Sequence, residues 1–225
     1  MKNICIILAR KNSKRIKNKN IKSFCGKPLI YYSINLAKKS KLFERIIVST
    51  DSLKIKKIAE KYSAEVPFLR NKKLSNDYAS TKEVLNDVVD KISARHEYNI
   101  FCIYCTAPLL IEKDLINALK IFKNSKADGL YCITNYSHSP FRALKKKKKF
   151  IFPISIKNFN MRSQDLEKLF HDSGTFYIFK SKFLKKNYKR FSKKTAYYFL
   201  PKYRAIDIDE LEDFKLAEYI KKSNL

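Results

Sequence analysis

The sequence predicts a single α/β domain with a mainly parallel sheet and helices on both faces. Three observations support this prediction. Apolar segments typical of buried strands alternate with segments of helical spacing, which is the rhythm of β-α-β units. The chain has 225 residues, of which 45% are hydrophobic, enough for one domain with its own core. The predicted strands end in polar residues, and open α/β sheets bind their ligands beyond the carboxyl ends of the strands.

Each element follows from its local pattern. Residues 3–9 are apolar almost throughout and predict a buried strand, while residues 28–39 start with a proline and carry apolar residues at helical spacing. The same two patterns recur along the chain. The predicted strands are residues 3–9, 45–49, 99–104, 128–134 and 203–208. The predicted helices are residues 28–39, 53–62, 81–92, 112–122 and 211–221.

The alternation breaks between residues 137 and 194. This stretch is richer in aromatic residues, turns and charge, and it contains five consecutive lysines at 145–149, which predict a solvated turn. We therefore expect one domain spanning residues 1–225, in which roughly residues 137–194 form a subdomain.

The net charge of +28 raises the alternative of a basic RNA-binding module. Two features weigh against it. The basic residues are forty lysines, spread along the whole chain, and only nine arginines, which gather at strand ends and other special segments. The sequence also contains no aromatic RNA-binding motif. We therefore expect no specific nucleic-acid partner.

The five cysteines are odd in number and lie mostly in apolar segments, which is typical of reduced core residues in a cytoplasmic protein. Cys102 and Cys105 have the spacing of half a zinc site, but on a strand their sulfurs face opposite sides, so zinc is not predicted. No apolar run approaches the roughly 20 residues of a membrane span, so no membrane association is expected. Of the three histidines, His96 is expected on a helix surface.

The first strand runs into a loop rich in cations and free of glycine, ARKNSKRIKNKN, at residues 9–20. Backbone amides together with Arg10, Ser13, Lys14 and Lys19 offer enough positive charge to hold a triphosphate. The alternative is a solvated basic loop, but the position directly after a core strand favours a phosphate site.

Two acids lie two residues apart in IDID at 206–209. On a strand, Asp207 and Asp209 point to the same side, and paired carboxylates suit Mg²⁺, which shares its oxygen ligands with substrate phosphates. The alternative is a strand end followed by a helix whose first turn is enriched in acids. The scarcity of acids in so basic a chain favours the metal site.

Together these segments resemble the CMP-sialic acid synthetase (acylneuraminate cytidylyltransferase) family, which activates nine-carbon acidic sugars. The resemblance covers nearly the whole chain in the family's order, through ILARKNSKRIKNKNI, GKPLIYYSI, IIVSTD, AEVPFLR, NDYAST, RSQDL and DIDELED. The pseudaminic acid branch is the most similar, because of Arg15, the segment YCTAP at 104–108, and RSQDL followed by HDSGTFY. One departure is that Lys11 and Asn12 replace the glycines of the family's common RGGSK loop.

The resemblance implies a three-layer, Rossmann-like nucleotidyltransferase fold with a protruding segment that completes a homodimer. The resemblance thus implies that roughly residues 137–194 serve dimerisation and sugar binding, which would explain the break in rhythm after residue 137. The implied reaction transfers CMP from CTP to a nonulosonic acid, with Mg²⁺ as cofactor and pyrophosphate as the second product. The implied acceptor is pseudaminic acid, and N-acetylneuraminic acid, legionaminic acid, an eight-carbon acid and a neutral sugar phosphate remain alternatives.

The resemblance also implies roles for individual residues. Arg10, Ser13, Lys14, Asn20 and either Lys19 or Lys22 would surround the CTP phosphates, and Arg70, Ala79, Ser80 and Thr81 would contact the nucleoside. Asp207 and Asp209 would bind Mg²⁺, and Arg162, Gln164, His171 and Tyr177 would line the sugar pocket, with Tyr104 beside them. Arg10, Lys14 and Asp209 are the expected catalytic residues. The general base stays open between Asp209, a metal-bound water and His171.

Overall fold

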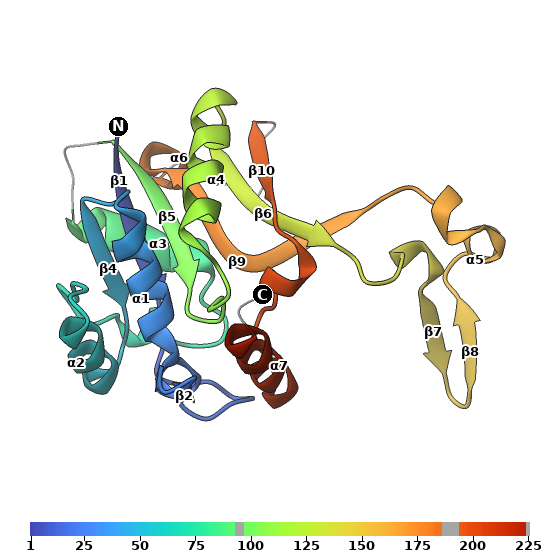
Figure 1. The fold of residues 1–225 in the computed structure, drawn as a ribbon, viewed down its shortest axis with the longest axis horizontal. Helices are drawn as coiled ribbons and strands as arrows, with labels where there is room; N and C mark the ends of the chain where they lie inside the picture. Colours follow the sequence, from blue (N-terminus) through green and yellow to red (C-terminus); the bar gives the residue numbers. More distant parts are fainter. Residues whose placement is uncertain (93–96, 186–193, 224–225) are drawn as a thin grey trace.

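The computed structural model describes residues 1–92, 97–185 and 194–223, so His96 lies outside the described residues. Its centre is a six-stranded sheet with the strand order β10-β6-β9-β5-β1-β4 (Figure 1). The strands are β1 (Lys2–Leu8), β4 (Arg45–Ser49), β5 (Tyr98–Tyr104), β6 (Gly129–Asn135), β9 (Phe170–Lys180) and β10 (Thr195–Phe199). All pairings are parallel except those of β9, which runs antiparallel between β5 and β6. The mainly parallel sheet is confirmed.

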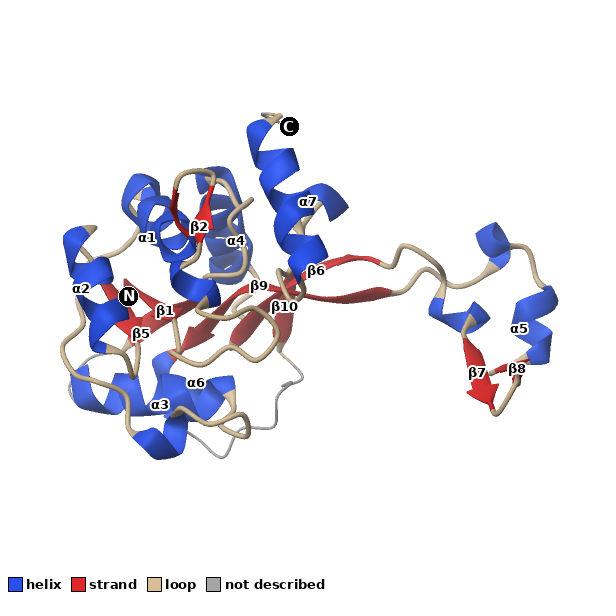
Figure 2. Cartoon of the chain, turned by 90° about the horizontal axis from the view of Figure 1, so that it is seen from below, coloured by secondary structure: helices blue, strands red, loops and turns tan. Residues whose placement is uncertain are grey.

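Helices cover both faces of this sheet and give the predicted three layers (Figure 2). On one face lie α1 (Leu29–Ser40), α2 (Leu53–Lys61) and α4 (Glu112–Asn124), and on the other lie α3 (Thr81–Ile92) and α6 (Ser181–Lys185). The last helix, α7 (Leu211–Lys222), packs on the short β2 (Ser23–Phe24) region through Phe24 and Phe214. β2 pairs with β3 (Lys27–Pro28).

The first strand shows why a central parallel strand reads as a continuous apolar run. Ile4 and Ile6 pack against α3, while Cys5 and Ile7 pack against the α1 side, and all four are at most 1% exposed. Because both faces of the sheet are covered, neither set of alternating side chains meets water. The middle of β1, from Ile4 to Ile7, is therefore buried, and the strand leads at its C-terminal end into the loop of cations.

The predicted strand at 203–208 is wrong. Pro201 has no N–H for a sheet ladder, and the chain turns there into a 3₁₀ helix, Lys202–Arg204, followed by irregular backbone. The edge of the sheet belongs instead to β10, which the sequence patterns did not reveal. The apolar alternation at 206–208 has another cause, because Ile208 is fully buried with Phe24 and Phe214 beneath α7.

A slender arm projects from the body between β6 and β9 (Figure 1). It carries a hairpin of β7 (Leu144–Lys147) and β8 (Phe150–Pro153), the short helix α5 (Ile156–Asn160) and two 3₁₀ turns, Pro140–Arg142 and Ser163–Asp165. Part of the lysine run at 145–149 lies in β7 and the rest turns the hairpin, and all five lysines are exposed. Strand β9, which falls within the stretch 137–194, and β10, which begins directly after it, belong to the central sheet.

All five cysteines are free, and four of them are buried. Cys102 and Cys105 pack into apolar clusters on opposite sides of the sheet, as the strand pattern predicts. Within the described part of the chain, no helix combines the length and apolar character needed to cross a bilayer.

Candidate active site

The carboxyl ends of the neighbouring strands β1 and β5 line a cleft of about 570 Å³ through Leu8 and Tyr104. The predicted CTP ligands line this cleft with the single exception of Ser80, and the predicted metal ligands line it too. These residues are Arg10, Ser13, Lys14, Lys19, Asn20, Arg70, Ala79, Thr81, Asp207 and Asp209. Tyr104 closes one side of it. Lys22 does not line the cleft and lies over the Phe214 ring instead, so of the two alternatives the structure places Lys19 there.

The loop after β1 keeps its shape without glycine. Residues 9–17 all have negative φ, so Lys11 and Asn12 carry no left-handed strain. Side chains fasten the loop: the Asn20 amide donates to the Arg10 carbonyl at 2.9 Å, and the Lys11 N–H donates to Asp51 Oδ1 at 2.7 Å. Asn20 therefore holds the loop that carries the cations, in addition to lining the cleft.

The cations of the cleft are paired with the chain's own carboxylates. Asp77 bridges Arg10 at 2.6 Å and Lys14 at 2.5 Å, and these two cations lower the pKa of its carboxyl, with Lys14 the larger cause. Asp209 bridges Arg15 at 2.6 Å and Lys19 at 3.3 Å. An incoming polyphosphate would exchange with these carboxylates. Asp77 was not among the predicted site residues, although it stands in the motif NDYAST.

Arg70 supplies a buried positive charge at the end of β4. It is 8% exposed, and its guanidinium donates to the Ser49 hydroxyl at 3.0 Å and to the Ser49 carbonyl at 2.5 Å. Desolvation by burial lowers the pKa of Arg70. An arginine stays charged even so, which leaves a fixed cation in the lining of the cleft.

Asp207 and Asp209 face the same cleft although no strand holds them. Their segment is pinned by the buried Ile208, whose N–H donates to the Thr106 carbonyl at 3.3 Å and whose carbonyl accepts from Lys19 Nζ at 2.5 Å. Asp207 keeps contact with solvent, yet the surrounding protein raises the pKa of its carboxyl to about 6 by desolvation, and the charge of Asp209 adds to the shift.

The two carboxylates fit Mg²⁺ as a partial ligand set. Mg²⁺ in phosphoryl-transfer sites is typically held by one or two carboxylates together with substrate phosphates and water. Within the described residues there is no cluster of three or more His, Cys, Asp or Glu side chains that would form a complete protein cage. The site therefore suits a metal that arrives with, or is completed by, a polyphosphate.

A second cavity of about 560 Å³ adjoins the first cleft and shares Tyr104 and Asp207 with it. Its remaining lining includes His171, Asp172, Gly174 and Tyr177. The Tyr177 hydroxyl donates to Asp172 Oδ2 at 2.8 Å, and His171 Nδ1 lies 2.9 Å from the Asp172 carbonyl oxygen. Three of the predicted sugar residues, Tyr104, His171 and Tyr177, are thus brought together beside the acid pair.

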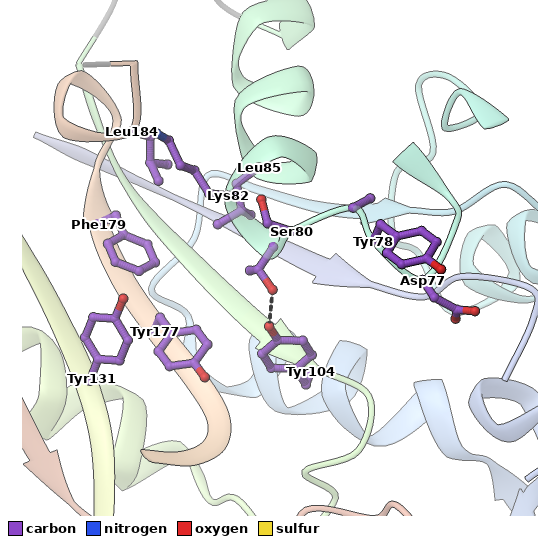
Figure 3. Close-up of a pocket in the computed structure, with 12 residues that line it drawn as sticks. Asp77, Tyr78, Ser80, Lys82, Leu85, Tyr104, Tyr131, Tyr177, Phe179 and Leu184 are labelled. Carbon is purple, nitrogen blue, oxygen red and sulfur yellow. Dashed lines mark hydrogen bonds between the residues drawn. The ribbon is translucent and has the colours of Figure 1, made fainter. Parts of the chain in front are cut away.

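A third cavity of about 460 Å³ lies on the α3 side of Tyr104 and is shown in Figure 3. Here the hydroxyls of Thr81 and Tyr104 are hydrogen-bonded, which ties the start of α3 to the end of β5. Ser80 lines this cavity, and its hydroxyl and N–H both donate to Glu83 Oε2 at 2.7 Å. Ser80 therefore caps α3 and does not line the first cleft.

Arg162 and Gln164 lie in the arm, at the start of the turn Ser163–Asp165, and both are exposed. Neither residue lines any of the three cavities described above. Arg142 fixes this turn by donating to the Ser163 hydroxyl at 3.0 Å. Within one chain, the structure does not bring Arg162 and Gln164 to the other residues predicted to line the sugar pocket.

Comparison with known proteins identifies the family. The model of the Cytidylyltransferase family matches residues 4–224. The chain belongs to this family. It is 37% identical over 227 residues to a pseudaminic acid cytidylyltransferase of Campylobacter jejuni, covering 100% of this chain and 98% of that protein. It is 33% identical over 222 residues to a CMP-N,N'-diacetyllegionaminic acid synthase of the same species, covering 96% and 94% of the two chains.

The fold of this cytidylyltransferase is also that of a solved synthetase. The structure of a CMP:2-keto-3-deoxy-manno-octonic acid synthetase complexed with CTP superposes with a TM-score of 0.73, covers 100% of both chains, and has 14% sequence identity. The fold expectation and the family resemblance read from the motifs are both confirmed, and the chain is an enzyme of cytidylyl transfer.

Proposed function

We propose that this cytidylyltransferase transfers CMP from CTP to pseudaminic acid, a nine-carbon acidic sugar, and releases pyrophosphate. The observation that carries the proposal is the junction of two cavities: a cleft lined by cations and an acid pair opens at Tyr104 and Asp207 into a pocket lined by His171 and Tyr177. The 37% identical, full-length relative named for pseudaminic acid supports the choice of sugar.

The chain's cations would provide most of the catalysis. Arg10, Lys14 and Lys19 would exchange their carboxylate partners for the β- and γ-phosphates and stabilise the charge that develops on the leaving pyrophosphate. Asp207 and Asp209 would hold Mg²⁺, which when bound neutralises charge on the reacting phosphate. Arg70 adds a fixed positive charge that needs no rearrangement during the reaction.

The acceptor would lie in the cavity next to Asp207 and direct its anomeric hydroxyl to the α-phosphorus. Holding the two reactants in adjoining cavities supplies the orientation on which such a transfer depends. His171 lines the acceptor cavity and is our candidate for the group that accepts the hydroxyl proton, since Asp209 is engaged by two cations.

We further propose that the arm pairs two chains and carries Arg162 to the acceptor cavity of the partner subunit. The arm exposes large apolar side chains, with Ile151 at 65% and Ile156 at 70%, which a second copy would cover. Each nonulosonic acid has a carboxylate beside its reacting carbon, and a guanidinium grips a carboxylate with two parallel hydrogen bonds. Arg162 lacks access to the acceptor cavity of its own chain, which favours action in trans.

Pyrophosphate release tests the proposed function. The assay uses CTP and Mg²⁺ with pseudaminic, N-acetylneuraminic, legionaminic and 2-keto-3-deoxy-manno-octonic acids, with UTP in place of CTP and EDTA in place of Mg²⁺ as controls. We expect pseudaminic acid to have the highest kcat/KM and both controls to show little turnover. A higher kcat/KM for another acid would assign that acid as the substrate. Full activity in EDTA would show that the reaction does not need Mg²⁺.

A further inference from the structure

Gly174 in β9 approaches Asp207 so closely that no side chain would fit between them. A Cβ built on Gly174 would lie 2.8 Å from Asp207 Oδ2 and 3.3 Å from its Cγ. Real Cβ atoms essentially never come this near another heavy atom, so any other residue at position 174 forces one partner to move. The atom in the way belongs to the carboxylate that joins the nucleotide cleft to the acceptor cavity.

The backbone around Gly174 cannot retreat. The register between β6 and β9 shifts here, so that Cys132 alone stands opposite residues 173–176 in a bulge. Ser173 and Thr175 on either side are at most 3% exposed, their hydroxyls lie 2.8 Å apart, and Ser173 donates to the Cys132 carbonyl at 3.0 Å. The Gly174 N–H itself donates to Asp172 Oδ1 at 3.0 Å.

The Asp207 side chain is the part that would give way. The backbone of its segment is held on the far side by the buried Ile208, which bonds to Thr106 and to Lys19. With both backbones held, a side chain at 174 has to turn the Asp207 carboxylate away from its present place. The absence of a side chain at 174 therefore sets where this carboxylate lies.

We propose that Gly174 is a positioning residue that fixes the Asp207 carboxylate for metal binding, by presenting bare backbone where a side chain would displace it. This inference rests on the proposed function, since it takes Asp207 as a carboxylate that holds Mg²⁺. The left-handed conformation of Gly174, with φ +64°, accounts for a glycine at the bulge but not for its contact with Asp207.

Gly26 offers a matched control. It also has a left-handed backbone, with φ +82°, but nothing lies within 4 Å of a Cβ built on it. Substitution at Gly26 therefore brings the backbone strain without a clash. Alanine and asparagine separate the two effects at Gly174 as well, because asparagine tolerates the left-handed region better than alanine but is larger.

The experiment measures Mn²⁺ binding to the enzyme–CTP complex without acceptor sugar, from the loss of the free-ion electron paramagnetic resonance signal, for the wild type, G174A, G174N, G26A, G26N and D207N. Binding of CTP in EDTA and the thermal midpoint are measured for each. We expect both Gly174 variants to bind Mn²⁺ roughly 10- to 100-fold more weakly, the scale of losing a group that orients a metal ligand. The affinity of both Gly174 variants for CTP in EDTA should equal that of the wild type. Both Gly26 variants should bind Mn²⁺ and CTP with wild-type affinity.

Several results would overturn the inference. Wild-type Mn²⁺ affinity in G174A, or better affinity in G174N than in G174A, would show that the glycine serves the backbone alone. Failure of both Gly174 variants to fold would do the same, because the clash should be absorbed by the Asp207 side chain. Wild-type Mn²⁺ affinity in D207N is a different failure: it would remove Asp207 from the metal site and with it the proposed function of that carboxylate.

Discussion

The body and the arm differ in how far they expose isoleucine and basic side chains to solvent. In the body, the isoleucines of β1 are at most 1% exposed, whereas in the arm Ile151 and Ile156 are 65% and 70% exposed. The cations of the cleft are paired with Asp77 and Asp209, while the lysines of β7 lie exposed on the hairpin. The body is complete by itself, and the arm has the composition of one half of an interface.

This difference divides the proposed reaction between two places. The groups that would hold CTP and the metal come from the loops of the body, which one chain assembles alone. The guanidinium proposed for the sugar carboxylate stands on the arm, away from the cleft of its own chain. Changes in the body should therefore affect the chemistry, and changes in the arm should affect assembly and acceptor recognition.

The largest effect is expected in the body. D207N and D209N keep the shape of each side chain but remove the charge that would hold Mg²⁺, and we expect kcat to fall by about 1,000-fold, at the upper end of the loss of a single electrostatic contribution. Pyrophosphate release at saturating substrates measures this. E212Q, which removes a nearby exposed charge outside the cleft, is the control and should keep wild-type kcat. Near-normal turnover of both aspartate variants would refute the metal assignment.

The next effect concerns assembly through the arm. I151D places a charge in the proposed interface, and an uncompensated buried charge should raise the dimer dissociation constant by at least about 100-fold. L53D is the matched control, because Leu53 on the body is 63% exposed, almost the same as Ile151. Light scattering after size-exclusion chromatography gives the mass of each. If I151D has the mass of the wild type, or if the wild type is a monomer, the arm does not form a dimer interface.

A smaller effect is expected for the arm's guanidinium. R162K keeps the charge but loses the paired hydrogen bonds, and we expect kcat/KM for the sugar to fall by about tenfold, the scale of one charge-assisted hydrogen bond. The KM for CTP should not change, because Arg162 does not line the nucleotide cleft. K157Q, which removes another exposed cation of the arm, is the control. Equal losses for CTP and sugar would contradict an acceptor role.

The smallest expected effect is an increase in the affinity for CTP. D77N frees Arg10 and Lys14 from their carboxylate partner, so CTP no longer has to displace it. Exposed ion pairs are weak, and we expect CTP to bind only about two- to fivefold more tightly. Calorimetry at low salt measures this. D87N breaks the exposed Asp87–Lys91 pair on α3 and should leave CTP affinity unchanged. Weaker CTP binding in D77N would show that Asp77 contacts the nucleotide instead of competing with it.

Sequence patterns predicted the regular β-α-β part of the body but not β9, the strand that departs from this pattern. β1 was recognisable because a strand covered on both faces is apolar at every position, and the polar residues at the strand ends marked the cleft. β9 was hidden, because its first half carries His171, Asp172, Ser173 and Gly174, whose place depends on the bulge and the cavity. A strand antiparallel to its neighbours also breaks the β-α-β rhythm on which the prediction relied.

The site was predicted in its membership but not in its pairings. The residues around the cleft could be found from motifs, some of which follow a strand end, as the loop after β1 does. The pairing of Asp77 with Arg10 joins residues 67 positions apart in the chain, so only the fold brings them together. The same holds for the pair of Asp77 with Lys14 and for the contact of Gly174 with Asp207. Asp207 and Asp209 do line one cleft, but not because of a strand: their segment is held by the buried Ile208.

Mixing two inactive variants tests the central claim, that the body of one chain and the arm of its partner form one site. D209N has a defective body and an intact arm, and R162A has the reverse, so a mixed dimer contains one fully intact site only if the arm acts in trans. After the subunits are exchanged at equal concentrations, pyrophosphate release at subsaturating sugar should recover to about a quarter of the wild-type rate, the statistical share of intact sites in a symmetric dimer. Activity equal to the mean of the two separate variants, with mixed dimers shown to have formed, would contradict the account.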